Sequence, residues 1–154
     1  MKKLRLYLDT TILNFLFADD SPEECRLTQK FFRQIKSFDV FISEVVLREV
    51  YRCAEPKQKK LLEVIDHYNI EILDFSVQAD QLAEIYIKKG IIPIKYRDDA
   101  NHIAVASLNN CDVLSWNFQH IVKVKTKREV SVINLHRGHN SIDIFTPREV
   151  VEDV

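Results

Sequence analysis

The sequence predicts an α/β domain, with a mostly parallel central sheet of about five strands that is flanked by helices. Short apolar runs alternate with longer segments of helical period, which is typical of this fold class. No repeat, low-complexity tract or Pro/Gly/Ser-rich linker divides the 154 residues. Because a chain of this length removes about 70% of its unfolded surface from water, residues 1–154 are expected to form a single domain.

The strands and helices follow from the lengths of the apolar segments and from their flanking residues. The expected strands are residues 4–8, 39–42, 70–73, 112–114 and 130–133. The expected helices are residues 12–17, 22–37, 44–53, 56–67, 77–89 and 98–109. Thr10 or Thr11 is expected to cap the first helix, and Ser43 is expected to cap the third, because their hydroxyl oxygens accept from free backbone N–H groups.

Charge and composition exclude several classes of protein. The 22 Lys and Arg residues nearly cancel the 23 Asp and Glu residues, so a polyanion must be met by a local basic patch. Residues 123–128, KVKTKR, would present their lysines on one side of an extended chain, either as a solvated edge or as a strip that attracts phosphate. With only two glycines, the chain cannot build a Walker A loop or a dinucleotide fingerprint.

Cysteine usage and hydropathy indicate a cytoplasmic protein. The three cysteines are far apart and odd in number, which disfavours a disulfide framework and a thiolate zinc site. The basic start MKKLRLYLD lacks the apolar stretch of a signal peptide, since Asp9 and Asn14 interrupt it. No run approaches the roughly 18 apolar residues of a membrane span, so we expect no membrane association.

Acidic side chains stand where the expected strands give way to helices. Asp9 ends the first strand, and Glu49 lies on the helix that follows the second. Asp99 opens a later helix, and Asn117 follows the strand after it. Ligands of open parallel sheets bind beyond the carboxyl ends of the strands, and hard divalent cations prefer such oxygen donors. Taken alone, however, Asp9 is more simply explained as a helix cap.

The order of these motifs resembles that of PIN-domain ribonucleases, in the branch that includes the VapC toxins of toxin–antitoxin pairs. The stretches YLDTTILNFLF, SEVVLREV and DANHIAVA place the family's first three acids at Asp9, Glu49 and Asp99. In VLSWNFQHI, Ser115 fits the family's hydroxyl position, whereas Asn117 replaces the usual aspartate. The tail NLHRGHNSIDIFTPREVVE also resembles members in which a last strand leads into a Thr-Pro-x-Glu helix start.

The resemblance implies a three-layer PIN-like fold and a Mg²⁺ or Mn²⁺ site. Its expected ligands and catalytic residues are Asp9, Glu49, Asp99 and Asn117. Its expected hydrogen-bond donors to the ligand carboxylates or to phosphate are Thr10, Thr11 and Ser115. Asp98 is expected to cap the helix or to support the ligands from behind. For His102, a contact with Asp98 or Asp99 along the same helix is expected rather than metal ligation.

The expected function is metal-dependent endoribonuclease activity on RNA, as the toxin of a type II pair with an antitoxin partner. We also expect a homodimer, and Leu61, Leu62 and Ile65 offer a candidate face, although core packing is the simpler use of that face. Two alternatives stay open. A phosphatase or receiver domain would use Asp9 as nucleophile, but Thr11 stands where a DxD motif needs its second acid. A degenerate PIN fold would bind RNA or protein without cleaving, which Asn117 allows.

Overall fold

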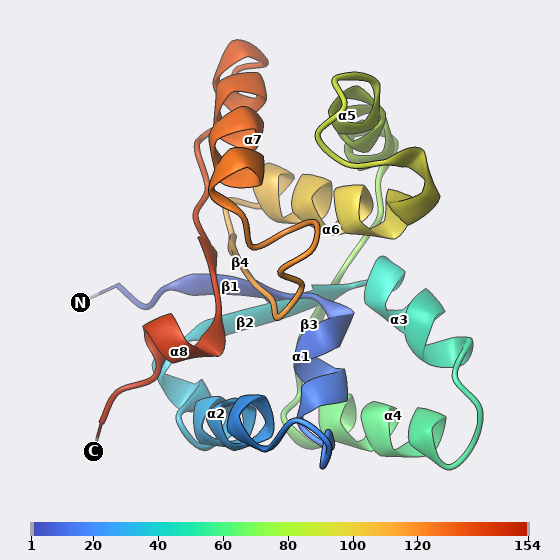
Figure 1. The fold of residues 1–154 in the computed structure, drawn as a ribbon, viewed down its shortest axis with the longest axis vertical. Coiled ribbons are helices and arrows are strands. Elements are labelled where there is room, and N and C mark those ends of the chain that lie inside the picture. The colour runs from blue at the N-terminus through green and yellow to red at the C-terminus, as the bar shows by residue number, and fades with distance from the viewer. Residues whose placement is uncertain (1, 154) are drawn as a thin grey trace.

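The computed structural model describes residues 2–153 and confirms the α/β prediction. A five-stranded sheet, all of whose strands are parallel, forms the centre in the order β3-β2-β1-β4-β5 (Figure 1). Its strands are β1 (Arg5–Leu8), β2 (Asp39–Ser43), β3 (Glu71–Leu73), β4 (Asp112–Leu114) and β5 (Ile144–Phe145). Strand β1 lies in the middle, and the chain is built outward from it on both sides.

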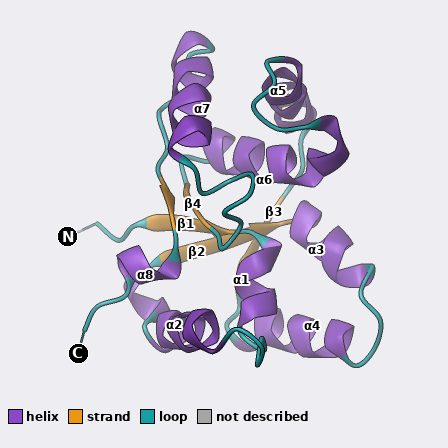
Figure 2. Ribbon diagram, in the orientation of Figure 1, coloured by secondary structure: helices purple, strands orange, loops and turns teal. Residues whose placement is uncertain are grey.

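Helices cover both faces of the sheet, which gives the expected three layers. They are α1 (Thr10–Phe15), α2 (Pro22–Arg33), α3 (Glu44–Tyr51), α4 (Lys57–His67), α5 (Val77–Lys88), α6 (Arg97–Leu108), α7 (Val124–His136) and α8 (Pro147–Val150). Figure 2 shows α1, α2 and α4 on one side of the strands and α5, α6 and α7 on the other. None of the helices within residues 2–153 has the length and apolar character needed to cross a membrane.

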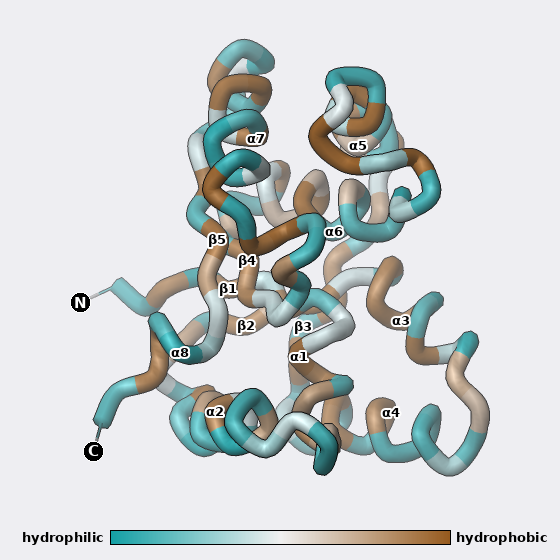
Figure 3. The backbone as a smooth tube through the Cα atoms, viewed as in Figure 1, coloured by the Kyte–Doolittle hydropathy of each residue, from teal (hydrophilic) through white to brown (hydrophobic). Residues whose placement is uncertain are grey.

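The core lies where the central strands meet these two layers. Leu6, Tyr7 and Leu8 of β1 are all fully buried, as expected for a strand covered on both faces. The helices instead alternate between hydrophobic and hydrophilic residues, as the brown and teal segments of Figure 3 show. On α4, Leu61 and Ile65 belong to the buried core, so this face packs inside the domain.

The predicted strand at residues 130–133 is wrong, because this segment lies in α7. Its β-branched residues favour a strand, yet Thr126, Val130 and Asn134 are the buried residues of α7 and recur every four positions. The same helix begins at Val124, so KVKTKR is not the extended strip predicted above. The fifth strand is β5, which pairs with β4.

Two smaller differences concern helix ends. The expected helix at residues 22–37 stops at Arg33, and a separate 3-10 turn (η1, Ile35–Ser37) follows it. The predicted Thr-Pro-x-Glu helix start is confirmed, because Thr146 and Glu149 form a reciprocal capping box at the start of α8.

The assigned core can be tested by making the same substitution, valine to alanine, at one buried position and at one exposed position. Val105 of α6 is fully buried, whereas Val132 of α7 is 59% exposed. We expect Val105→Ala to lower the free energy of unfolding by about 2 kcal/mol, because it removes two buried methyl groups and leaves a cavity. Val132→Ala is the control and should change it little. Equal effects of the two substitutions in urea unfolding would contradict the assigned core.

Candidate functional site

Three predicted acids lie at the carboxyl edge of the sheet. Asp9 directly follows β1, Glu49 lies on the helix after β2, and Asp99 lies in the first turn of α6. Strands β1 and β2 are parallel neighbours, so their carboxyl ends lie at the same edge. The charges of Asp9 and Glu49 both raise the pKa of Asp99, which shows that the three carboxylates are close enough to interact.

Asp9 is a buried acid that binds hydroxyl groups on two sides. Its side chain is almost inaccessible, and Oδ1 accepts from the Thr11 backbone N–H at 3.1 Å and from Thr11 Oγ1 at 2.5 Å. Oδ2 accepts from Ser115 Oγ at 2.5 Å. Asp9 is also the N-cap of α1, so neither Thr10 nor Thr11 is the predicted cap. The same carboxylate therefore caps a helix and belongs to the acidic site.

Glu49 is held by one of its two carboxylate oxygens. Oε1 accepts from Thr10 Oγ1 at 2.9 Å and contacts His102 Nε2 at 2.5 Å. Within residues 2–153, no hydrogen-bond donor reaches Oε2. The side chain is 29% exposed. Glu49 thus keeps one oxygen available for a ligand, while Thr10 acts as the predicted donor to a site carboxylate.

His102 has a different partner from the one predicted. The imidazole is 2% exposed and contacts Glu49 of another helix instead of Asp98 or Asp99 on its own. Its Nδ1 lies 2.6 Å from the Tyr7 hydroxyl, which in turn lies 2.7 Å from Ser43 Oγ. The sequence did indicate that His102 lies near the acids, because a residue three positions after Asp99 shares its helix face. It did not indicate the contact with Glu49.

Asp98 and Asp99 have separate roles. Asp98 accepts a hydrogen bond from Arg52 at 2.9 Å and does not cap α6, because the N-cap position belongs to Tyr96. The ion pair links the start of α6 to the end of α3. Asp99, by contrast, interacts with Asp9 and Glu49. The structure therefore groups Asp99, and not Asp98, with the acids of the site.

The amide oxygen of Asn117 is bound by the backbone of its own turn. Its Oδ1 accepts from the His120 backbone N–H at 2.9 Å, which fixes the orientation of the amide. The Asn117 side chain favours the ionised form of Asp99 and so lowers its pKa. Ligation by the Asn117 oxygen stays a prediction, because one of its two lone pairs already accepts from His120.

Burial and like charge raise the pKa values of two of the acids. Burial is the largest cause for Asp9, whose pKa lies above its ordinary value even though His102, Ser115 and Thr11 favour the ionised form. Burial likewise raises the pKa of Asp99 to about 6, with Asp9 and Glu49 adding to the effect. The site thus disfavours its own negative charge, which is the condition in which a cation or a proton is bound.

The donor chemistry suits a hard divalent cation, since carboxylate oxygens are the preferred ligands of Mg²⁺ and Mn²⁺. The spacing is looser than that of a formed metal site. Within residues 2–153, no three His, Cys, Asp or Glu side chains are close enough together to hold one ion as they stand. Binding by all three acids at once therefore requires their carboxylates to come closer together than they lie in this structure.

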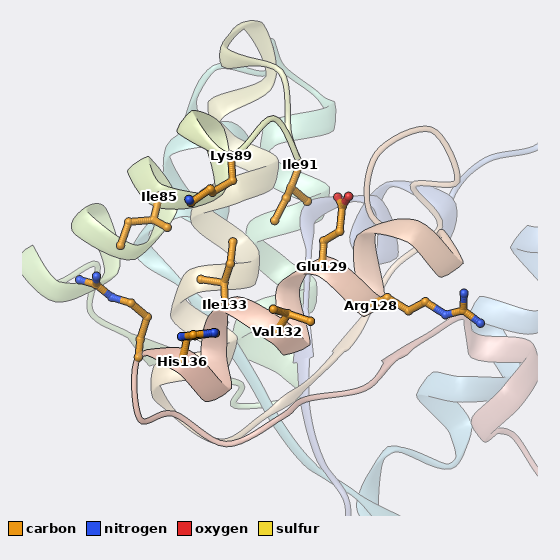
Figure 4. A pocket seen from close by; sticks show the side chains of 9 residues that line it. Ile85, Lys89, Ile91, Arg128, Glu129, Val132, Ile133 and His136 are labelled. Atoms are coloured by element: carbon orange, nitrogen blue, oxygen red, sulfur yellow. The ribbon is translucent and has the colours of Figure 1, made fainter.

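A groove of about 620 Å³ lies elsewhere, between α5 and α7 (Figure 4). Its lining residues are Ile85, Lys89, Ile91, Arg128, Glu129, Val132, Ile133, His136 and Arg137. None of the predicted site residues belongs to this lining. The acidic site therefore does not lie in this groove, and it is identified by its charges and hydrogen bonds instead of by a cavity.

Comparison with known proteins gives one family and several similar folds. The family model described as PIN domain matches residues 6–124. A DNA-bound VapBC structure from Salmonella typhimurium aligns with a TM-score of 0.60 at 19% identity, covering 94% of this chain and 98% of that one. FitAcB from Neisseria gonorrhoeae aligns with a TM-score of 0.58 at 16% identity, and the alignment covers 94% of this chain and 99% of that one. A toxin–antitoxin complex from Klebsiella pneumoniae aligns with a TM-score of 0.59 at 16% identity, and the alignment covers 79% of this chain and 93% of that one. No curated protein matches the chain.

Because the pKa of Asp99 is raised, replacing its carboxylate by a neutral amide should stabilise the fold, and the size of this effect should depend on pH. The pKa is about 6 in the folded protein against an ordinary 3.8, so ionised Asp99 destabilises the fold, and stability falls as the pH rises through this interval. Asp99→Asn should therefore unfold less readily than wild type at about pH 7.5, by about 2–3 kcal/mol, since one pKa unit corresponds to about 1.4 kcal/mol. The gain should vanish at about pH 4, where folded Asp99 already holds a proton.

Urea unfolding in EDTA measures this gain, and Asp98→Asn is the matched control. That variant loses the ion pair with the exposed Arg52 and weakens a long hydrogen bond from Asn101, so a small loss of stability is expected. A folded Asp99→Asn protein that is no more stable than wild type near neutral pH would show that burial and the neighbouring acids do not raise the pKa of Asp99.

Proposed function

The chain belongs to the PIN domain family, and we propose that it is a Mg²⁺- or Mn²⁺-dependent endoribonuclease. The observation that carries this proposal is the group of three carboxylates, Asp9, Glu49 and Asp99, at the carboxyl edge of the sheet. Two of them have raised pKa values, as expected for acids that are arranged to receive a cation. Membership of the PIN domain family, whose members are generally nucleases, supports nuclease activity. That the substrate is RNA and that the metal is Mg²⁺ or Mn²⁺ is our proposal.

Each acid has a distinct part in binding the metal. When bound, Mg²⁺ or Mn²⁺ would acidify a water molecule and offset the charge on the phosphoryl oxygens. Asp9 presents a fixed oxygen, because Thr11 and Ser115 restrain its carboxylate. Glu49 presents Oε2, and Asp99 supplies the third carboxylate. Because both hydroxyls donate to Asp9 in this structure, we assign Thr11 and Ser115 to orienting the acid rather than to contacting phosphate.

We further propose that the chain is the toxin of a type II toxin–antitoxin pair. The solved structures that resemble it include a DNA-bound VapBC and a complex described as toxin–antitoxin, and they support this role. The proposed partners are RNA, an antitoxin protein and a second copy of the chain. Since Leu61 and Ile65 are buried in the core, the homodimer must use another face.

A non-catalytic PIN domain that binds RNA or protein is the second candidate. Two observations favour it: the Asn117 oxygen is turned toward His120, and the acids do not converge on one point. Metal-dependent cleavage separates the two functions, because a binding module would retain RNA without hydrolysing it.

The first test is cleavage of single-stranded RNA with Mn²⁺ or Mg²⁺ and with EDTA. We expect cleavage that EDTA abolishes and that Asp9→Asn reduces at least about 100-fold, since the substitution removes a charge from the metal site. Asp80→Asn, on an exposed position of α5, is the matched control and should cleave like wild type. Full activity in a folded Asp9→Asn protein, or activity that persists in EDTA, would refute the mechanism.

Asn117 gives a second test through metal affinity. An aspartate at this position has two equivalent oxygens, so one can still accept from His120 while the other replaces the NH₂ group beside Asp99. The added charge should tighten Mn²⁺ binding in the free protein, because a nearby anion favours a divalent cation. Cleavage need not accelerate, since tighter ground-state binding raises the rate only if the transition state gains more.

Calorimetric titration of Mn²⁺ into the two proteins measures this change. Asn140→Asp is the control, because Asn140 bonds to Asn110 just before β4, at the opposite edge of the sheet. Unchanged or weaker affinity in Asn117→Asp would place residue 117 outside the metal site.

A further inference from the structure

We propose that His102 is a positioning residue, which holds Glu49 so that its free oxygen faces the metal site. The proposal rests on the proposed metal-dependent function and adds a residue that the predicted ligand set does not contain. Its basis is a chain of four buried or half-buried side chains, each within hydrogen-bond distance of the next. In order, they are Ser43, Tyr7, His102 and Glu49.

The chemistry of the partners fixes which nitrogen of His102 serves Glu49. An ionised carboxylate only accepts, so the short 2.5 Å contact places a proton on Nε2, which donates to Oε1. Nδ1 then contacts the Tyr7 hydroxyl at 2.6 Å. Both ring nitrogens are thereby engaged, and the ring cannot flip without losing two hydrogen bonds. Such a partner on the second nitrogen is the usual way in which proteins fix an imidazole.

The other end of the chain is anchored in the core. Tyr7 lies in the central strand and is fully buried, and its hydroxyl contacts Ser43 Oγ at 2.7 Å. Ser43 also accepts from the Val45 backbone N–H and so caps α3, the helix that carries Glu49. Glu49 is therefore linked through His102 and Tyr7 to the central strand. The same chain of contacts ends at Ser43, which caps the helix that carries Glu49.

Glu49 requires such a restraint because its side chain is long and partly exposed. Fixing an unrestrained glutamate side chain in one rotamer costs conformational entropy. Both bonds from the protein, from Thr10 and His102, go to Oε1. Oε2 is left for the cation, so the carboxylate is presented already oriented. His102 and Asp99 also share one face of α6, so the contact keeps Glu49 beside Asp99.

A competing role predicts the opposite sign. If His102 instead acts as a resident positive charge that competes with the metal for Glu49, its removal should tighten metal binding. If it positions Glu49, its removal should weaken metal binding. The two roles are therefore distinguished by the direction of one measured change.

The experiment is calorimetric titration of Mn²⁺ into wild type and variants without RNA, followed by RNA cleavage over a range of Mn²⁺ concentrations. Loss of a group that orients a metal ligand costs about 10- to 100-fold in metal affinity. We expect that loss in His102→Ala, with the KM for RNA at saturating Mn²⁺ nearly unchanged. His102→Gln should recover part of the affinity, because its amide nitrogen can donate where Nε2 did.

Tyr7→Phe extends the test to a variant that removes only one hydroxyl. It should weaken Mn²⁺ binding several-fold, since it frees Nδ1 of His102. Tyr86→Phe is the matched control: Tyr86 is also a buried tyrosine whose hydroxyl contacts two side chains, Ser107 and Asn134. It should lose comparable stability without any loss of Mn²⁺ affinity.

The outcomes separate this proposal from the function on which it rests. Wild type that neither binds Mn²⁺ nor cleaves RNA would refute the proposed function and the positioning role with it. Wild type that does both, with unchanged or tighter Mn²⁺ binding in folded His102→Ala, would refute the positioning role alone. If His102→Ala does not fold, equal Mn²⁺ affinity of Tyr7→Phe and Tyr86→Phe refutes it.

Discussion

The buried carboxylate of Asp9 is the interaction on which the rest of the site depends. It ends the central strand, caps α1 and binds the hydroxyls of Thr11 and Ser115. Thr11 Oγ1 also accepts from the Trp116 backbone N–H, so one charge joins β1, α1 and the loop after β4. A buried charge costs free energy unless it is hydrogen-bonded or paired, and these bonds only partly offset that cost. The remainder favours a cation at this edge of the sheet.

Much of the fold could be predicted because β1, β2 and α6 combine local propensity with clear apolar patterns. The error at residues 130–133 shows where this fails. The stretch VSVI has strand-forming residues, but its fate depends on packing that brings Val130 and Asn134 onto the domain. The actual fifth strand, Ile144–Phe145, is too short to have an apolar pattern. It forms because β4 has a free edge beside it.

The acids of the site could be predicted for a similar reason, since strand order alone brings Asp9, Glu49 and Asp99 to one edge. Their hydrogen bonds could not. The contact between His102 and Glu49 joins α6 to α3 across about 50 residues of sequence, and no local pattern contains it. The orientation of Asn117 depends on one turn, in which His120 N–H takes its oxygen. Residue types and strand order thus predicted which acids lie at this edge, whereas tertiary contacts determine which of their atoms are free.

The proposed function requires a divalent cation at the carboxyl edge of the sheet, among these three acids. Anomalous diffraction from crystals grown with Mn²⁺ locates such an ion directly. We expect a peak bounded by Asp9, by Glu49 Oε2 and by Asp99, with the contact between His102 and Glu49 Oε1 retained. A peak elsewhere, or no peak in crystals of a protein that cleaves RNA with Mn²⁺, would contradict it.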